Sequence, residues 1–279
     1  MKKIHIGQIP LYHFSLLFGY PEIIHFSTTR QGGTSEDSYS SLNLGFNSGD
    51  EKNNVQANRD ILTRTLGINT EQLVFGVQTH SAKVARITSD VLDWDLQTRR
   101  KMLAETDALM TNEPNICIAV KTADCIPVLL FDPVHKAAAA IHAGWRGTVG
   151  RIVSQTVDAM KQEYGTQPKD IVAGIGPGIG PEVYQVGSEV VEMVHRQLGE
   201  NHGLIQYRVS KNDHRETPHL NLWKANQLQL LDAGIPEENI EVARLCTFSH
   251  ANDFFSARRD GTATGRMATG IMIKEEYKK

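Results

Sequence analysis

Apolar positions along the chain repeat with two different periods, which separate expected helices from expected strands. Residues 50–66 carry apolar side chains at helical spacing, with Asp50 as the expected N-cap and Gly67 as the residue that ends the helix. The pattern predicts further helices over residues 147–164, 187–198 and 221–233. The expected strands are residues 73–77, 83–87, 116–120, 126–131, 136–142, 170–175, 240–245 and 267–273.

The order of these elements favours an α/β or α+β fold. Strand pairs lie between the helices, whereas a repeating βαβ fold would alternate one strand with one helix. We therefore expect packed mixed β-sheets flanked by helices. No linker, low-complexity segment or fixed-period repeat divides the sequence, so residues 1–279 are predicted to form a single domain.

Composition and charge narrow the class of protein. The chain is 40% hydrophobic and 22% charged with a net charge of −3, which offers no basic surface for nucleic acid or an anionic membrane. No apolar run approaches the roughly 20 residues that span a bilayer. The first five residues lead into no signal-peptide pattern, and three cysteines are too few for a paired disulfide framework. A cytoplasmic protein is the expectation.

Three polar segments interrupt the apolar pattern where strands are expected to end. Residues 78–81, 122–127 and 142–148 contain His80, Cys125 and His142 respectively. Two imidazoles and one thiolate form a ligand set that zinc accepts, and three protein ligands leave one position open for water or substrate, as in catalytic zinc sites. Taken singly, each of these residues is more typical of a packed or exposed side chain than of a ligand. The polar and glycine-rich neighbours favour the metal interpretation.

The two other cysteines are expected to be ordinary core residues. Cys117 lies between two isoleucines in the middle of an expected strand, and Cys246 lies beside Thr247 and Phe248. Free cysteine in such a setting behaves as a small buried hydrophobe.

Longer motifs resemble one bacterial family. Besides the Gln-Thr-His, Ala-Asp-Cys and His-Ala-Gly-Trp-Arg-Gly runs at residues 78–80, 123–125 and 142–147, the matches are residues 26–33, 41–45, 175–177, 254–259 and 265–266. On these motifs the chain resembles the YlmD/YfiH proteins, also called the laccase-domain or polyphenol-oxidase-like family. The resemblance runs from residue 26 to residue 266, and the third run together with Ala-Asp-Cys is highly specific.

The resemblance implies a fold, a metal site and an activity. The fold is a YfiH-type domain of packed mixed sheets with outer helices, and the metal is zinc bound by His80, Cys125 and His142. The implied activity is that of a purine nucleoside phosphorylase acting on inosine, adenosine and methylthioadenosine, with adenosine deaminase activity as well. The family's older label is a copper-dependent polyphenol oxidase, and a role in peptidoglycan editing has been suggested for relatives.

Two rival chemistries use the same residues. A full laccase is disfavoured because it needs roughly ten histidines, typically in His-x-His pairs, and none of the 11 histidines here forms such a pair. A weak copper-dependent polyphenol oxidase activity stays an alternative, because copper(II) outcompetes zinc in raw affinity and could occupy the zinc site. The family fold has also been likened to cysteine hydrolases, with Cys125 as nucleophile and His142 as base. On residue type alone His80 could equally be the base, and the substrate of such a hydrolase or amidase would be a cell-wall fragment. The thiolate cannot act as nucleophile while it ligates zinc. A non-enzymatic metal-bound module is disfavoured because three ligands leave zinc open.

Nucleoside chemistry needs further groups. Zinc would activate water for deamination. Because no Glu adjoins either histidine, Asp124 or a carboxylate elsewhere in the chain would have to carry the proton. Phosphorolysis needs cations that hold phosphate, for which the candidates are Arg30, Arg59, Arg146 and Lys83. Each arginine could equally be a structural or solvated ion-pair partner.

The remaining candidates concern substrate contacts. Asn43 could bind a ribose hydroxyl or a purine edge. The glycine-rich residues 174–178 lack the third glycine of a dinucleotide-binding loop and are expected to make a tight turn that lines the pocket. Phe254, Phe255 and Arg258 could stack on a base, although phenylalanine pairs at this spacing are more often core.

Overall fold

Two six-stranded mixed sheets form the body of the protein, as a computed structural model describes it for residues 1–200, 202–209 and 216–275. In spatial order the first sheet contains β1 (Lys2–Ile6), β2 (Ile9–His13), β3 (Ile23–Thr28), β14 (Met267–Ile273), β7 (Cys117–Thr122) and β4 (Leu73–Phe75). The second contains β13 (Ile240–Val242), β10 (Val172–Ile175), β8 (Ile126–Asp132), β9 (Ala137–Ala143), β6 (Ala108–Thr111) and β5 (Val84–Arg86). Both sheets combine antiparallel pairs with parallel ones at β4–β7, β5–β6 and β10–β13. The expectation of mixed sheets is confirmed.

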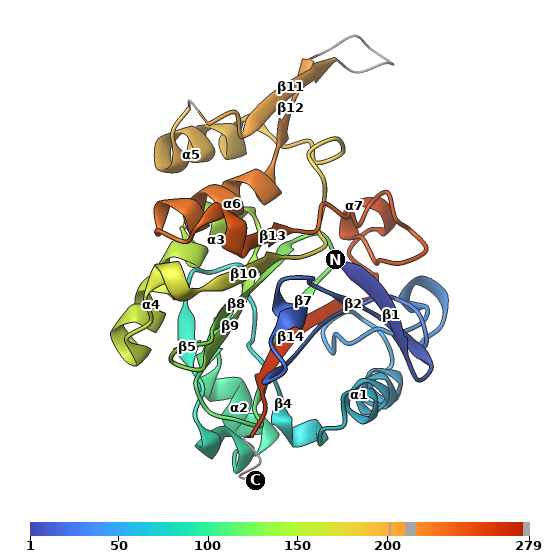
Figure 1. Ribbon diagram of the computed structural model, residues 1–279. Helices are drawn as coiled ribbons and strands as arrows, with labels where there is room; N and C mark the ends of the chain where they lie inside the picture. The colour runs from blue at the N-terminus through green and yellow to red at the C-terminus, as the bar shows by residue number, and fades with distance from the viewer. Residues whose placement is uncertain (201, 210–215, 276–279) are drawn as a thin grey trace.

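The sheets pack face to face and helices cover their outer faces. An apolar cluster that includes Ile118, Leu129 and Ile271 fills the space between the sheets. On the outer face of the first sheet, α1 (Lys52–Leu66) contributes Leu62 and Leu66 to a second cluster. The outer face of the second sheet is covered by α3 (Trp145–Val149), α4 (Ile152–Tyr164), α5 (Ser188–Leu198) and α6 (Leu222–Asp232). In Figure 1, α1 and α4 lie on opposite flanks of the molecule. The result is a four-layer arrangement of helix, sheet, sheet and helix.

Strand alternation determines which side chains reach the space between the sheets. Along β9, Ala138 and Ala140 belong to the inner cluster, whereas Ala139 and Ile141 face the helices. Side chains alternate between the two faces of a strand, so His142 falls on the inner face, at the end of the sheet. The inner layer therefore ends in a polar group.

The expected helix over residues 147–164 is two helices. The first starts earlier, with Gly144 as its N-cap, and the second starts after Arg151. Arg151 has a left-handed backbone with φ of 58°, and this conformation breaks the helix because it does not continue an α-helical turn. The short helix α3 is therefore the element that directly follows the strand with His142.

The ends of the other expected helices are partly confirmed. Gly67 and Gly165 end α1 and α4 with φ of 70° and 74°, as expected of left-handed C-terminal glycines. Asp50 is not the N-cap of α1: that residue is Glu51, and the Asp50 carboxylate accepts hydrogen bonds from Ser35 and Asn43 instead. The side-chain bonds to a neighbouring loop explain the difference.

Several elements have no counterpart among the predicted ones. They are the N-terminal strands β1–β3, strand β6, helix α2 (Leu96–Met102), the short α7 (Ala257–Asp260) and the hairpin of β11 (Ile205–Val209) and β12 (Glu216–Leu220). The hairpin projects from the body at the top of Figure 1. Short 3₁₀ turns occur at Leu17–Gly19, Asp37–Tyr39, Thr70–Gln72, Ser89–Leu92, Pro168–Asp170 and Glu237–Asn239. Within the described ranges, no helix is both long and apolar enough to cross a bilayer.

Candidate metal centre and active site

His80, Cys125 and His142 meet at one end of the inner layer. One potential ligand atom of each lies within 4.8 Å of the other two, and the two imidazole rings are 4.9 Å apart between centroids. His142 is buried, Cys125 is half-buried and His80 is exposed, so the group opens to solvent on the His80 side. Across the described residues this is the one such group of three or more His, Cys, Asp or Glu ligands. The structure thus brings together the three residues that the sequence singled out.

Gly144 leaves the space that a metal ion would need. A Cβ atom at this position would lie 2.9 Å from the Cys125 Sγ and 2.9 Å from the Cδ2 of His80. The backbone of Gly144 has an ordinary extended conformation, with φ of −72°, so its conformation does not require glycine. The glycine instead keeps a side chain out of the ligand group. The donor set and this free space together fit a zinc-type ion.

Asp107 forms hydrogen bonds with both histidines of the group. Its Oδ1 accepts hydrogen bonds from the Nδ1 of His142 at 2.7 Å and from the backbone N–H of His80 at 3.0 Å. Its Oδ2 accepts from the backbone N–H groups of Thr79 and Ser81 and from the Ser81 hydroxyl. The Asp107 side chain has no exposed surface. One buried carboxylate therefore contacts both imidazole-bearing segments.

The groups of the centre perturb one another's protonation. Burial acts to raise the pKa of the Cys125 thiol, but the charge and hydrogen bonds of His142 and His80 outweigh it and lower the pKa to about 6. Burial acts to lower the pKa of His142, and the charges and hydrogen bonds of Cys125 and Asp107 raise it to about 9. The chain without a metal therefore favours a thiolate beside an imidazolium at neutral pH. A thiolate is also the form that ligates a metal.

Asp124 lies next to Cys125 with both carboxylate oxygens engaged. Oδ1 accepts a 2.7 Å hydrogen bond from the Thr247 hydroxyl, and Oδ2 accepts one of 2.7 Å from the backbone N–H of Arg258. These bonds join the turn before β8 to the segment after β13. Proton transfer by Asp124 stays a prediction, and the contacts show in addition that it fixes the turn that carries Cys125.

The glycine-rich residues 174–178 pack against that same turn. A Cβ on Gly178 would lie 2.9 Å from the carbonyl oxygen of Asp124 and 3.2 Å from that of Cys125. Ile179 donates its N–H to the Asp124 carbonyl at 2.8 Å. Glycine is needed here for the close approach of two backbones.

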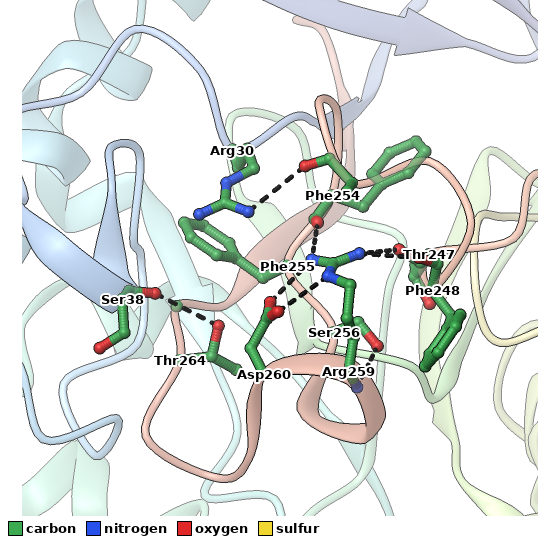
Figure 2. Close-up of polar contacts among 12 residues, drawn as sticks. Arg30, Ser38, Thr247, Phe248, Phe254, Phe255, Ser256, Arg259, Asp260 and Thr264 are labelled. Carbon is green, nitrogen blue, oxygen red and sulfur yellow. Dashed lines mark hydrogen bonds and ion pairs between the residues drawn. The ribbon is translucent and has the colours of Figure 1, made fainter.

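The segment that reaches Asp124 is itself tied together by Arg259. Figure 2 shows its guanidinium among backbone carbonyls and the carboxylate of Asp260. All five N–H groups are used: two bind Asp260, and the others bind the carbonyls of Thr247, Phe248 and Phe254. Phe254 and Phe255 are fully buried, as expected of core residues.

The proposed substrate residues fall into two groups. Asn43 and Arg59 are engaged within the protein: the Asn43 amide binds Ser48, Asp50 and two backbone N–H groups, and Arg59 donates to the Leu44 carbonyl between the rings of Phe46 and Phe75. Arg30 belongs to this first group as well, because it donates to the carbonyls of Ser40 and Ala251 and stacks on Phe255. Lys83 and Arg146 are exposed; Lys83 donates to the Ala104 carbonyl and Arg146 stacks on Trp145. Their roles toward substrate stay predictions.

Three residues near the centre were not among the predicted site residues. They are Asp107, Tyr184 and Arg266. Burial raises the pKa of the Tyr184 phenol, and the charge of Cys125 raises it further. Burial lowers the pKa of Arg266, and the charge of Cys125 acts against that effect. That influence places both side chains around the thiol. Arg266 lies in a matched motif, whereas nothing in the pattern around Asp107 or Tyr184 marks them.

Comparison with known proteins agrees with the geometry. Residues 24–274 match the family model described as multi-copper polyphenol oxidoreductase laccase. A purine nucleoside phosphorylase of Bacteroides thetaiotaomicron is 44% identical, over 93% of this chain and 95% of its own length. The adenosine deaminase RL5 of an unknown prokaryote is 38% identical, over 89% of this chain and 93% of its own.

The fold agrees as well. The crystal structure of the Bacillus licheniformis protein YfiH superimposes with a TM-score of 0.82 at 35% identity, covering 90% of this chain and 93% of that one. The YfiH-type fold expected from the sequence is confirmed. The chain belongs to the YlmD/YfiH family of laccase-like domains.

Proposed function

We propose that this enzyme is a zinc-dependent purine nucleoside phosphorylase with additional adenosine deaminase activity. Its substrates would be inosine, adenosine or methylthioadenosine together with phosphate, and its products the free base and ribose 1-phosphate. The observation that carries the proposal is the solvent-open group of His80, Cys125 and His142, with ligand atoms within 4.8 Å of one another. The names of the two relatives support both activities.

The three side chains would hold zinc through one thiolate and two imidazole nitrogens. Bound there, zinc would supply a Lewis acid and a source of activated water, which suits attack on the purine ring during deamination. The same ligands also accept copper(II), so metal analysis of the purified protein has to include both ions.

Among the predicted cationic residues, Arg146 is the best candidate for binding phosphate. It is exposed and follows Gly144 by two positions, and Gly144 is the residue at which an added Cβ would meet both Cys125 and His80. Its guanidinium is stacked on Trp145, which leaves the N–H edge available for bidentate hydrogen bonds to an anion. Arg59 is the weaker candidate because it is packed between two phenylalanine rings.

One observation favours a second candidate function, a thiol hydrolase. The Cys125 thiol with a pKa of about 6 beside His142 resembles the nucleophile and base of cysteine hydrolases. The two functions differ in the state of the thiol. A zinc-bound Cys125 resists alkylation until a chelator is added, whereas a hydrolase nucleophile is alkylated in the protein as purified.

The proposed reaction is tested with inosine in the presence and absence of phosphate. Hypoxanthine and ribose 1-phosphate should form only with phosphate. Release of hypoxanthine without phosphate would identify a hydrolase of nucleosides, and no base release from any of the three nucleosides would refute the phosphorylase. Deamination is measured separately as ammonia released from adenosine, which should not depend on phosphate.

A further inference from the structure

The loop that carries His80 forms a small concave array of backbone donors. His80 has a left-handed backbone with φ of 64°, and the N–H groups of Thr79, His80 and Ser81 all point at one carboxylate. Successive backbone N–H groups in such a turn form an anion-binding concavity. Here the anion belongs to the protein itself, since Asp107 fills the concavity.

The same carboxylate sets the ring of His142. Asp107 Oδ1 lies 2.7 Å from the His142 Nδ1, and the backbone N–H of His142 donates to the Asp107 carbonyl, also at 2.7 Å. A carboxylate accepts and cannot donate, so Nδ1 must carry the proton. Nε2 is then the ring atom that faces Cys125 and His80, and its lone pair is free for a metal once the ring has lost its second proton. A carboxylate on the second ring nitrogen is a known way to orient a metal-binding histidine.

We propose that Asp107 is the positioning residue that prepares both histidine ligands for the metal before the metal binds. It fixes His80 through the backbone of its loop and His142 through its ring. The two ligands, 62 positions apart in the sequence, are thereby coupled through one side chain. The inference rests on the proposed metal site but not on the proposed reaction. The tests below measure metal affinity and backbone hydrogen exchange, and neither measures catalysis. Failure of the positioning role can therefore be distinguished from failure of the phosphorylase assignment.

The first test is Asp107→Asn. An asparagine must turn its NH₂ group either toward the N–H groups of Thr79 and Ser81 or toward His142, where it would demand the wrong tautomer. We expect zinc affinity, measured by competition with a chromophoric chelator, to fall about 10- to 100-fold. With cobalt(II) as a spectroscopic probe, the absorption of the thiolate-ligated ion should change in position or intensity. Unchanged affinity and an unchanged cobalt spectrum would overturn the proposal.

Asp132 provides a matched control within the same protein. Its side chain is likewise fully buried, its Oδ1 accepts from the backbone N–H groups of Val134 and His135, and its Oδ2 lies 2.9 Å from the Nδ1 of His135. Asp132→Asn therefore removes the same kind of contacts from another turn. It should lower the stability of the protein without altering zinc affinity. Equal loss of zinc affinity in both variants would show a general stability effect and refute positioning.

A measurement on the wild-type protein decides the matter even if Asp107→Asn does not fold. The backbone N–H groups of residues 79–81 should exchange slowly with solvent deuterium in the zinc-loaded protein and remain slow after zinc is removed by chelation, because their acceptor is Asp107. If these amides become as fast as an open loop once zinc is removed, the metal orders the loop and Asp107 does not prepare it.

Discussion

The cysteine at the centre differs from the other two in its surroundings, and this difference can be tested by substitution. Cys117 is 1% exposed in an apolar cluster, and burial raises the pKa of its thiol to about 12. We expect Cys125→Ala to lose stoichiometric zinc in metal analysis, because one of three ligands is removed. Cys117→Ala should retain the metal and lose only some stability. Zinc retained at full stoichiometry in Cys125→Ala would disprove the ligand assignment.

Gly144 allows a test that leaves all three ligands in place. In Gly144→Ala the added methyl carbon would lie 2.9 Å from both Cys125 Sγ and His80 Cδ2, which is shorter than an ordinary van der Waals contact. Because the backbone at this position suits alanine, the chain should fold normally and bind zinc more weakly, as isothermal titration would measure. The control is Gly19→Ala, where a Cβ meets nothing within 4 Å. Zinc binding as tight in Gly144→Ala as in the control would contradict the close packing.

At the scale of residues, the sequence identified the three candidate metal ligands but not the carboxylate that hydrogen-bonds to the two histidine segments. His80, Cys125 and His142 stand out because polar residues and glycines surround them at expected strand ends. Asp107 does not stand out, because its partners are backbone N–H groups and a ring nitrogen 35 positions away, and because it precedes β6, a four-residue strand too short to show a period. Hydrogen bonds across sequence distance leave no local pattern.

At the scale of elements, Arg259 organises the segment from Thr247 to Asp260. Lysine has three N–H donors on a point-like ammonium, so Arg259→Lys cannot satisfy the three carbonyls and the carboxylate that the guanidinium binds. The loss should lower the free energy of unfolding by about 1–3 kcal/mol and increase proteolysis within the segment. Urea unfolding and limited proteolysis measure the two effects. Arg196→Lys, at an exposed position of α5, is the control and should change neither.

The elements that the sequence did not predict share a physical cause. Strand β1 lies at the edge of its sheet and is almost wholly exposed, so its side chains show no buried face. Strand β2 is buried throughout its five residues and therefore lacks the alternation of a half-buried strand. Strands β7, β8 and β9 were predicted because they are long, apolar and central. Mixed sheets with outer helices could thus be inferred, whereas the strand order required contacts between distant segments.

At the scale of the whole molecule, the two sheets make the centre possible. The first sheet supplies β4 and β7, which lead to His80 and Cys125, and the second supplies β9 with His142 and β6, which follows Asp107. Each ligand therefore depends on the packing of one sheet against the other through the inner cluster. Loss of that packing would separate the ligands, so we expect metal binding and global folding to be linked.

The stability of this assembly should fall in acid because of a buried histidine that is not one of the three ligands. His25 on β3 is 4% exposed, and its Nε2 accepts the backbone N–H of Phe14. Burial, followed by the neighbouring His13, lowers the pKa of His25 to about 3. The unfolded chain takes up this proton near pH 6.5. The contribution of neutral His25 is therefore complete above pH 6.5 and is lost as the pH falls toward 3.

Replacing that histidine should flatten the acid limb of the stability curve. By pH 4.5 the wild-type protein should lose about 3 kcal/mol of unfolding free energy through His25. In His25→Gln the amide oxygen can still accept from Phe14 and does not titrate, so urea unfolding at pH 7 and pH 4.5 should differ less than in the wild type. His5→Gln, at an exposed position, should keep the wild-type difference. If His25→Gln keeps it too, the acid sensitivity arises elsewhere, with the buried His13 as the next group to replace, because burial lowers its pKa as well.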